Sequence, residues 1–208
     1  SATCWNYLEL HAPSSPQPEQ EAWITQHLQS FHDLMHTQGY TDPETGYPAW
    51  IDVDSFVNKV IIQELSREMD SYVRSTYFHK DLGGKIVAGP LWDFDLSFGV
   101  GGSFQNTNIE GWAYQQTRSP VATDWFTRLM ADPAFVDRIR SRWQELRRGA
   151  LSDAAMDTRI AELTDPLANA ADRNFQKWPN LTSARVGFFT TPTAGTWAGQ
   201  VDAMRTWA

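Results

Sequence analysis

The sequence has little cysteine, no long apolar run and no excess of basic charge. Its 208 residues include one cysteine, Cys4, which cannot form a disulfide within the chain. No run of about 18 apolar residues occurs, so no membrane span is predicted. The net charge of −8 and the isoelectric point near 5.0 argue against non-specific binding of nucleic acid. The sequence therefore predicts an acidic globular protein that binds neither nucleic acid nor the membrane interior.

Histidine is also sparse, with five in the whole chain, and these do not form a ligand-spaced set with Cys4. His32 and His36 are four residues apart on a predicted helix, and we interpret them as a surface pair rather than as metal ligands. Tryptophan, in contrast, is abundant, with ten residues. This abundance favours either an aromatic core or a surface that stacks on sugars or other flat ligands.

The segment from residue 70 to residue 99 predicts a β-hairpin followed by an acidic block. Ser75–Lys80 is rich in the aromatic and β-branched residues that strands favour. Asp81–Gly84 supplies the glycines of a tight turn, and Lys85–Leu91 forms the returning strand. Pro90 lacks a backbone donor, which predicts a bulge or the end of the strand at that position.

Asp93 and Asp95 follow this hairpin as an aspartate pair with one residue between them. If the segment stays extended, both carboxylates point to one face while Trp92 and Phe94 point into the core. Two neighbouring carboxylates need a compensating cation, and Mg²⁺, Mn²⁺ or Ca²⁺ suits such oxygen ligands. Alternatively, one aspartate caps a turn and the other pairs with an arginine.

Apolar residues recur at helical spacing over residues 19–38, 53–65, 121–149, 152–171 and 194–208, whereas residues 5–10 alternate like a short strand. The expected fold is α+β, mostly helical with a small central antiparallel sheet, and we treat residues 1–208 as a single domain. The predicted core consists of Phe56, Val60, Ile61, Ile86, Val87, Trp92, Phe94, Phe98, Ile139 and Trp143.

The stretch Ile51–Gly99 resembles the spore-coat-protein-H (CotH) kinase family. The similarity lies in a helix, a D-x-Y-x-x-S-x-Y segment that starts at Asp70, a hairpin with adjacent glycines, and the block G-P-x-W-D-F-D-x-x-F-G. The downstream stretches Asp124–Ser152 and Arg173–Pro179 also look like this family. The resemblance therefore covers most of the chain from Trp5 onward.

The resemblance implies an atypical protein kinase-like fold that transfers the γ-phosphoryl group of ATP to a serine of a protein partner. Asp70 is similar to the catalytic aspartate that orients the acceptor hydroxyl. Asp93 and Asp95 fall in the segment that holds Mg²⁺ or Mn²⁺ against the phosphates. Arg74 and Lys80 are expected either to contact phosphate or to form surface ion pairs. A secreted or cell-surface location is also implied.

The sequence departs from ordinary kinases in having no glycine-rich nucleotide loop, no V-A-I-K lysine and no H-R-D motif. We therefore expect the nucleotide-clamping lobe of the domain to lie upstream, as a separate segment of the same domain. Two other functions stay open at this point. One is a catalytically inactive surface, adhesion or carbohydrate-associated module of the same fold. The other is a glycosidase that uses Asp70 with Asp93 or Asp95.

Overall fold

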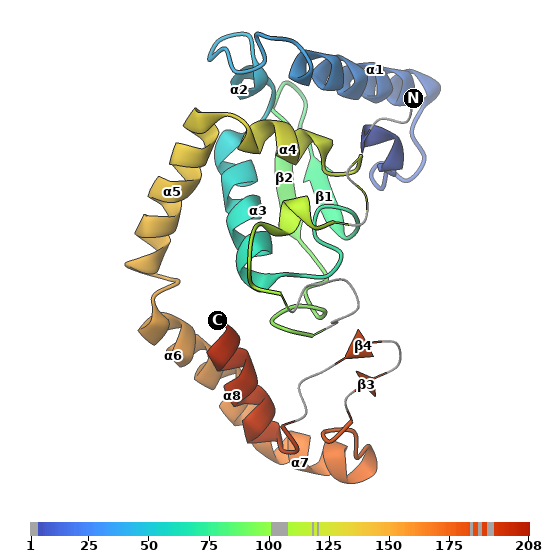
Figure 1. The fold of residues 1–208 in the computed structure, drawn as a ribbon. Helices are drawn as coiled ribbons and strands as arrows, with labels where there is room; N and C mark the ends of the chain where they lie inside the picture. The colour runs from blue at the N-terminus through green and yellow to red at the C-terminus, as the bar shows by residue number, and fades with distance from the viewer. Residues whose placement is uncertain are drawn as a thin grey trace.

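The computed structural model describes residues 4–100, 108–117, 119, 121–183, 185–186, 189–190 and 194–208. Figure 1 shows two groups of elements, a larger one with the hairpin and a second, helical one that carries the C-terminus. Helix α5 (Pro133–Arg147) leads from the first group toward the second. No helix in these described ranges is long and apolar enough to cross a membrane.

The first group begins with the short 3-10 helix η1 (Cys4–Tyr7), where the alternation over residues 5–10 had predicted a strand. That prediction is wrong, because the segment has no strand partner among the described residues and packs beside α1 (Pro18–Met35) instead. The one-turn helix α2 (Tyr47–Trp50) comes next along the chain.

Helix α3 (Val53–Ser66) is the central helix of this group. It begins where the sequence predicts, because the Asp52 carboxylate accepts a hydrogen bond of 2.9 Å from the backbone N–H of Ser55. It ends at Arg67, which takes the left-handed conformation with φ of 51°. One side of α3 packs on strand β2 and another on α5, so the helix lies between them.

The predicted hairpin is confirmed as the antiparallel strands β1 (Thr76–His79) and β2 (Val87–Leu91). Thr76 pairs with Leu91 and Phe78 with Ala88, so β2 carries one extra residue at Gly89–Pro90. This is the bulge predicted from Pro90. An isolated parallel bridge joins Ile86 to Ile51, just before α3, and fixes the turn end of the hairpin beside the start of that helix.

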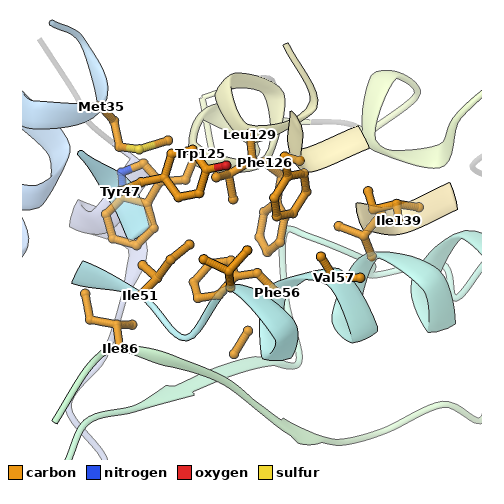
Figure 2. Close-up of a cluster of buried hydrophobic side chains, with 14 of the residues drawn as sticks. Met35, Tyr47, Ile51, Phe56, Val57, Ile86, Trp125, Phe126, Leu129 and Ile139 are labelled. Carbon is orange, nitrogen blue, oxygen red and sulfur yellow. The ribbon is translucent and has the colours of Figure 1, made fainter. Parts of the chain in front are cut away.

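The hydrophobic core lies where α1, α2, α3, α4 and α5 meet the hairpin, as Figure 2 shows. Its buried side chains are Phe31, Met35, Tyr47, Ile51, Val53, Phe56, Val57, Val60, Ile61, Tyr72, Ile86, Ala88, Trp125, Phe126, Leu129, Phe135 and Ile139. Half of the predicted core is confirmed: Phe56, Val60, Ile61, Ile86 and Ile139. Of the rest, Trp143 packs at the margin, Val87, Phe94 and Phe98 are half-buried, and Trp92 is 59% exposed.

The remaining helices of the first group are the 3-10 turn η2 (Ala113–Gln115) and α4 (Asp124–Met130), which precedes α5. The second group comprises α6 (Asp153–Thr164), η3 (Asp165–Leu167), α7 (Ala168–Lys177), the strand pair β3 (Arg185–Val186) and β4 (Phe189–Thr190), and α8 (Trp197–Trp207). The single helix predicted over residues 152–171 is interrupted at η3, because Pro166 has no backbone N–H to donate. The fold class is α+β and mostly helical, with small antiparallel sheets, as expected.

Candidate functional site

Two loops that are separated in sequence by the hairpin lie side by side at the end of α3. We call residues 67–75 the Asp70 loop and residues 92–99 the acidic loop. The backbone N–H of Met69 donates to the carbonyl of Leu96 over 2.9 Å, and that of Phe98 donates to the carbonyl of Ser66 over 2.8 Å. These two hydrogen bonds join the segment that carries Asp70 to the segment that carries the aspartate pair.

Glu68 is a buried acidic residue near the start of the Asp70 loop. Its side chain is buried, with 6% of the residue exposed. The pKa of the Glu68 carboxyl is raised to about 7, chiefly by burial, while a hydrogen bond from the backbone N–H of Asp70 opposes the rise. Nearby negative charges add to the rise, and they belong to three aspartates: Asp70, Asp93 and Asp95. The negative charges of all three predicted acidic residues therefore act on one buried carboxyl group.

The acidic loop does not continue the strand, which corrects the expectation of an extended W-D-F-D segment. Strand β2 ends at Leu91, and Asp93 has a left-handed φ of 63°. This conformation turns the chain, so Trp92 lies in solvent instead of in the core. Both aspartates are exposed, and the Oδ2 atom of Asp93 accepts a hydrogen bond of 3.3 Å from the hydroxyl of Ser75 in the Asp70 loop.

The two loops also concentrate unfavourable backbone conformations. Non-glycine residues with positive φ occur, within the described ranges, in these two loops alone: Arg67, Tyr72, Ser75, Asp93 and Phe98. Each such conformation costs roughly 1–3 kcal/mol and persists where the surrounding structure enforces it, which happens most often at functional sites. The local geometry thus marks the same two segments as the charges do.

Arg67 fixes one side of the Asp70 loop. Its residue is 4% exposed, and its guanidinium donates hydrogen bonds of 2.9 Å to the carbonyls of Glu110 and Gly111. A third hydrogen bond of 3.4 Å reaches the side-chain oxygen of Gln116. Arg67 therefore ties the segment before η2 to the start of the loop, and it is not available as a partner for substrate.

Tyr72 fixes the other side of the loop through Glu64 of α3. The buried Tyr72 hydroxyl donates to the Glu64 Oε1 atom over 2.8 Å. The same carboxylate accepts backbone hydrogen bonds from Ala113, at 2.6 Å, and Tyr114, at 3.1 Å. Burial raises the pKa of Glu64, while these donors oppose the rise. Helix α3, η2 and the Asp70 loop are thereby held together at one carboxylate.

Lys59 is a residue of the site region that the sequence reasoning missed. It is 1% exposed, and its Nζ atom has no hydrogen-bond partner among the described residues. Burial lowers the pKa of Lys59 to about 8, and the negative charge of Glu68 opposes that change. Gln63 and Ser66 follow on the same face of α3, and each carries a buried oxygen atom that likewise lacks a partner in this part of the chain. The sequence did hold a signal for this cluster, because the three polar residues recur at i, i+4 and i+7 of a buried helix.

The predicted phosphate contacts Arg74 and Lys80 lie in different places. Arg74 is exposed within the Asp70 loop, where its backbone N–H donates to the carbonyl of Asp70 over 2.9 Å. Lys80 follows the opposite end of β1, with its Nζ atom 5.1 Å from the ring centroid of Trp23 in α1. Arg74 thus belongs to the Asp70 loop, whereas Lys80 lies beyond β1 and next to α1.

The carboxylates of the two loops are oxygen donors of the type that a hard divalent cation takes, but within the described residues no three acidic groups of these loops bring ligand atoms within 4.8 Å of one another. Within the ranges that the structure describes, no lysine or arginine forms an ion pair with Asp93 or Asp95. The alternative in which an arginine compensates one of them is therefore not seen among these residues. Exposed carboxylate oxygens beside a further aspartate are a donor set that suits Mg²⁺ or Mn²⁺.

Comparison with known proteins places this α+β chain in a family. The family model described as CotH kinase protein matches residues 5–208, which is essentially the whole chain. The chain belongs to the CotH kinase family. A search of curated proteins gave no match. A search of solved structures gave none either, so the kinase-like arrangement of the fold stays a prediction.

Proposed function

We propose that the protein is a metal-dependent protein kinase that transfers the γ-phosphoryl group of ATP to a serine hydroxyl of a protein at the cell surface. The observation that carries this proposal is the backbone pairing of Met69 with Leu96, which joins the loop of Glu68 and Asp70 to the loop of the aspartate pair. Membership of the CotH kinase family supports the reaction class, and the spore-coat origin of the family name is consistent with a surface location.

Each acidic residue has a distinct role in this proposal. Asp70 accepts a hydrogen bond from the serine hydroxyl, orients it toward the γ-phosphorus and takes up its proton. The new bond from oxygen to phosphorus forms as the bond from the γ-phosphorus to the bridging oxygen breaks, and ADP leaves. Asp93, with Asp95 beside it, would hold Mg²⁺ or Mn²⁺, which would supply positive charge to the phosphates. Arg74 is exposed in the Asp70 loop, where it can pair with phosphate oxygens. Lys80 has no role in this proposal.

The test uses the full chain with labelled ATP, Mg²⁺ or Mn²⁺ and a serine-rich acceptor protein. Asp70→Asn and Asp93→Asn should each lower transfer by about 100-fold or more, because each removes a group that acts in the transfer itself. Asp157→Asn on α6 is the matched control, since that aspartate is exposed and far along the chain from both loops. Transfer that persists unchanged in both loop variants would overturn the proposal.

A second candidate function is a non-catalytic surface module that binds glycans. Trp23, Trp92, Trp112 and Trp178 are exposed, and exposed indole rings stack on sugars. Calorimetry separates the two candidates. Binding of ATP with Mn²⁺ supports the kinase, whereas binding of a glycan that quenches tryptophan fluorescence, without any nucleotide binding, supports the surface module.

A further inference from the structure

We propose that His32, His36 and Asp124 form a second metal site, which binds a divalent ion of the zinc class. One potential ligand atom from each residue lies within 4.8 Å of the other two. The site is built from α1 and α4 and includes no residue of the Asp70 loop or the acidic loop. It therefore stands independently of the proposed kinase activity.

The fold brings the three side chains together from two helices. His32 lies in the last turn of α1 and His36 caps that helix, so the two imidazoles share a face with their centroids 4.3 Å apart. Asp124 is the first residue of α4, which contacts α1. The carboxylate thus enters from the neighbouring helix and faces both rings.

One carboxylate oxygen of Asp124 has no hydrogen-bond donor at this position among the residues that the structure describes. This oxygen, Oδ2, is buried. The same atom lies 3.2 Å from Nε2 of His36 and 3.9 Å from Nδ1 of His32. A positive charge between these atoms, either a proton on Nε2 of His36 or a bound metal ion, removes the repulsion between the carboxylate oxygen and the imidazole lone pairs. A bound metal ion would satisfy all three groups at once.

The orientation of His36 supports ligation through the ring nitrogen that faces Asp124. The Nδ1 atom of His36 lies 2.8 Å from the carbonyl oxygen of His32. A carbonyl only accepts, so Nδ1 carries a proton, and in the neutral imidazole Nε2 then presents its lone pair toward the carboxylate. Metal-binding histidines are commonly oriented by such a hydrogen bond from the other ring nitrogen.

The ring nitrogen of His32 that faces Asp124 is Nδ1, and ligation through this atom would replace the hydrogen bond that it accepts from Trp125. The Trp125 indole N–H donates to this Nδ1 atom over 3.3 Å, a long hydrogen bond that a metal can displace. The side chains of His32, His36 and Asp124 are 13%, 35% and 28% exposed, so an ion can enter from solvent.

The donor set selects the class of metal. Two imidazole nitrogens and one carboxylate oxygen suit Zn²⁺ and its neighbours Co²⁺ and Ni²⁺, whereas Mg²⁺ and Ca²⁺ prefer sites made of oxygen alone. Tetrahedral zinc with three protein ligands keeps a fourth position for water. Such an ion would connect the end of α1 to the start of α4 and stabilise the first group of elements.

The test measures zinc affinity of the full chain by calorimetry, and the visible absorption of bound Co²⁺ as a report of histidine ligation. We expect one equivalent of zinc, a raised thermal transition, and no displacement by excess Mg²⁺. His36→Gln and Asp124→Asn should each lower zinc affinity at least about tenfold and remove the thermal shift. His32→Gln provides a third variant, and circular dichroism establishes that each variant is folded.

The matched controls are His79→Gln on β1 and Asp157→Asn on α6, both at exposed positions, and neither should change zinc binding. The double variant Asp93→Asn/Asp95→Asn should also keep the cobalt spectrum, because its carboxylates belong to the acidic loop. Absence of zinc binding by the unaltered chain overturns the proposal. So does zinc binding that survives in His36→Gln and Asp124→Asn, or that disappears in the acidic-loop double variant.

Discussion

The indole N–H of Trp207 donates a hydrogen bond to the carbonyl of Leu65 over 3.3 Å. Leu65 lies in the last turn of α3, directly before the Asp70 loop, whereas Trp207 is the last residue of α8. The same ring lies against Gly99, at the end of the acidic loop. The C-terminal helix therefore covers the junction at which the two loops of the candidate site meet.

This contact makes Gly99 a sensitive position. Its φ of +87° is unfavourable for residues with a side chain, and a β-carbon there would lie 3.1 Å from the Cε3 atom of Trp207. We expect Gly99→Ala to lower the free energy of unfolding by about 1–3 kcal/mol. Urea denaturation followed by fluorescence measures this loss.

Gly83, in the turn of the hairpin, is the matched control because its φ is +71° and a β-carbon at this position would meet no described atom within 4 Å. Gly83→Ala should lower the free energy of unfolding by about 1 kcal/mol, which is the cost of the left-handed backbone conformation without any steric contact. The excess loss in Gly99→Ala should disappear in a Trp207→Ala background. Equal losses at the two glycines would mean that the ring contact contributes nothing.

Tyr72→Phe tests the anchor of the Asp70 loop. This change removes one of three donors from the Glu64 carboxylate and keeps the ring in the core. We expect a loss of about 1–3 kcal/mol in the free energy of unfolding, because the half-buried Glu64 carboxylate loses one of its three donors. Tyr114→Phe is the control, since the Tyr114 hydroxyl bonds only to the exposed side chain of Gln115 within the described contacts. A loss in the control as large as that in Tyr72→Phe would contradict the assignment.

The parts of the fold that depend on local chemistry could be predicted from the sequence. The Asp52 cap, the hairpin and the bulge at Gly89–Pro90 each follow from a few neighbouring residues. The interruption of the helix at Pro166 carried an equally local signal, which the apolar spacing over residues 152–171 outweighed in the prediction. Local signals suffice where the backbone groups are satisfied by near neighbours.

The parts that depend on tertiary structure could not be predicted in this way. Alternation placed Trp92 in the core, but the left-handed turn at Asp93 depends on the pairing of the acidic loop with the Asp70 loop. The proximity of Asp124 to His32 depends on the packing of α4 against α1, which no spacing within either helix encodes. The grouping of Asp70 with the aspartate pair was expected from the family resemblance, not from the residues alone.

Lys59 gives a prediction on the dependence of stability on pH. Its pKa is about 8 in the folded protein, against the ordinary lysine value of 10.5 in the unfolded chain, so between these values the unfolded chain binds more protons. Stability should therefore rise with pH across this window, and at pH 7 the buried charge costs on the order of 3 kcal/mol. Lys59→Met should raise the free energy of unfolding at pH 7 by about 2–3 kcal/mol, and this gain should shrink as the pH rises toward the pKa of the unfolded chain.

The coupled titration of Glu68 is removed by making the comparison in a Glu68→Gln background. Lys177→Met, at an exposed position on α7, is the control and should leave the pH dependence unchanged. Chemical denaturation at a series of pH values gives the difference between each variant and its parent. A gain at Lys59 that does not vary with pH would show that lost packing or altered helix propensity, rather than a buried charge, determines the effect.

Asp93 and Asp95 can be distinguished by their affinity for Mn²⁺. The Oδ2 atom of Asp93 contacts Ser75 in the Asp70 loop, and the charge of Asp93 acts more strongly on Glu68 than that of Asp95 does. We therefore expect Asp93 to be the principal ligand in the proposed metal site. In the presence of ATP, Asp93→Asn should weaken Mn²⁺ binding at least about tenfold, and Asp95→Asn should weaken it less.

The two variants are matched controls for each other, because each removes one negative charge from the same exposed loop. Their shared loss in affinity measures the general attraction of the acidic groups, and the difference between them measures direct ligation. Electron paramagnetic resonance of free Mn²⁺ provides the binding curve without depending on catalysis. Equal losses in Mn²⁺ affinity would indicate general attraction without a specific ligand. A larger loss in Asp95→Asn would assign the metal to Asp95, and the turn at Asp93 would then serve to orient the Asp95 side chain.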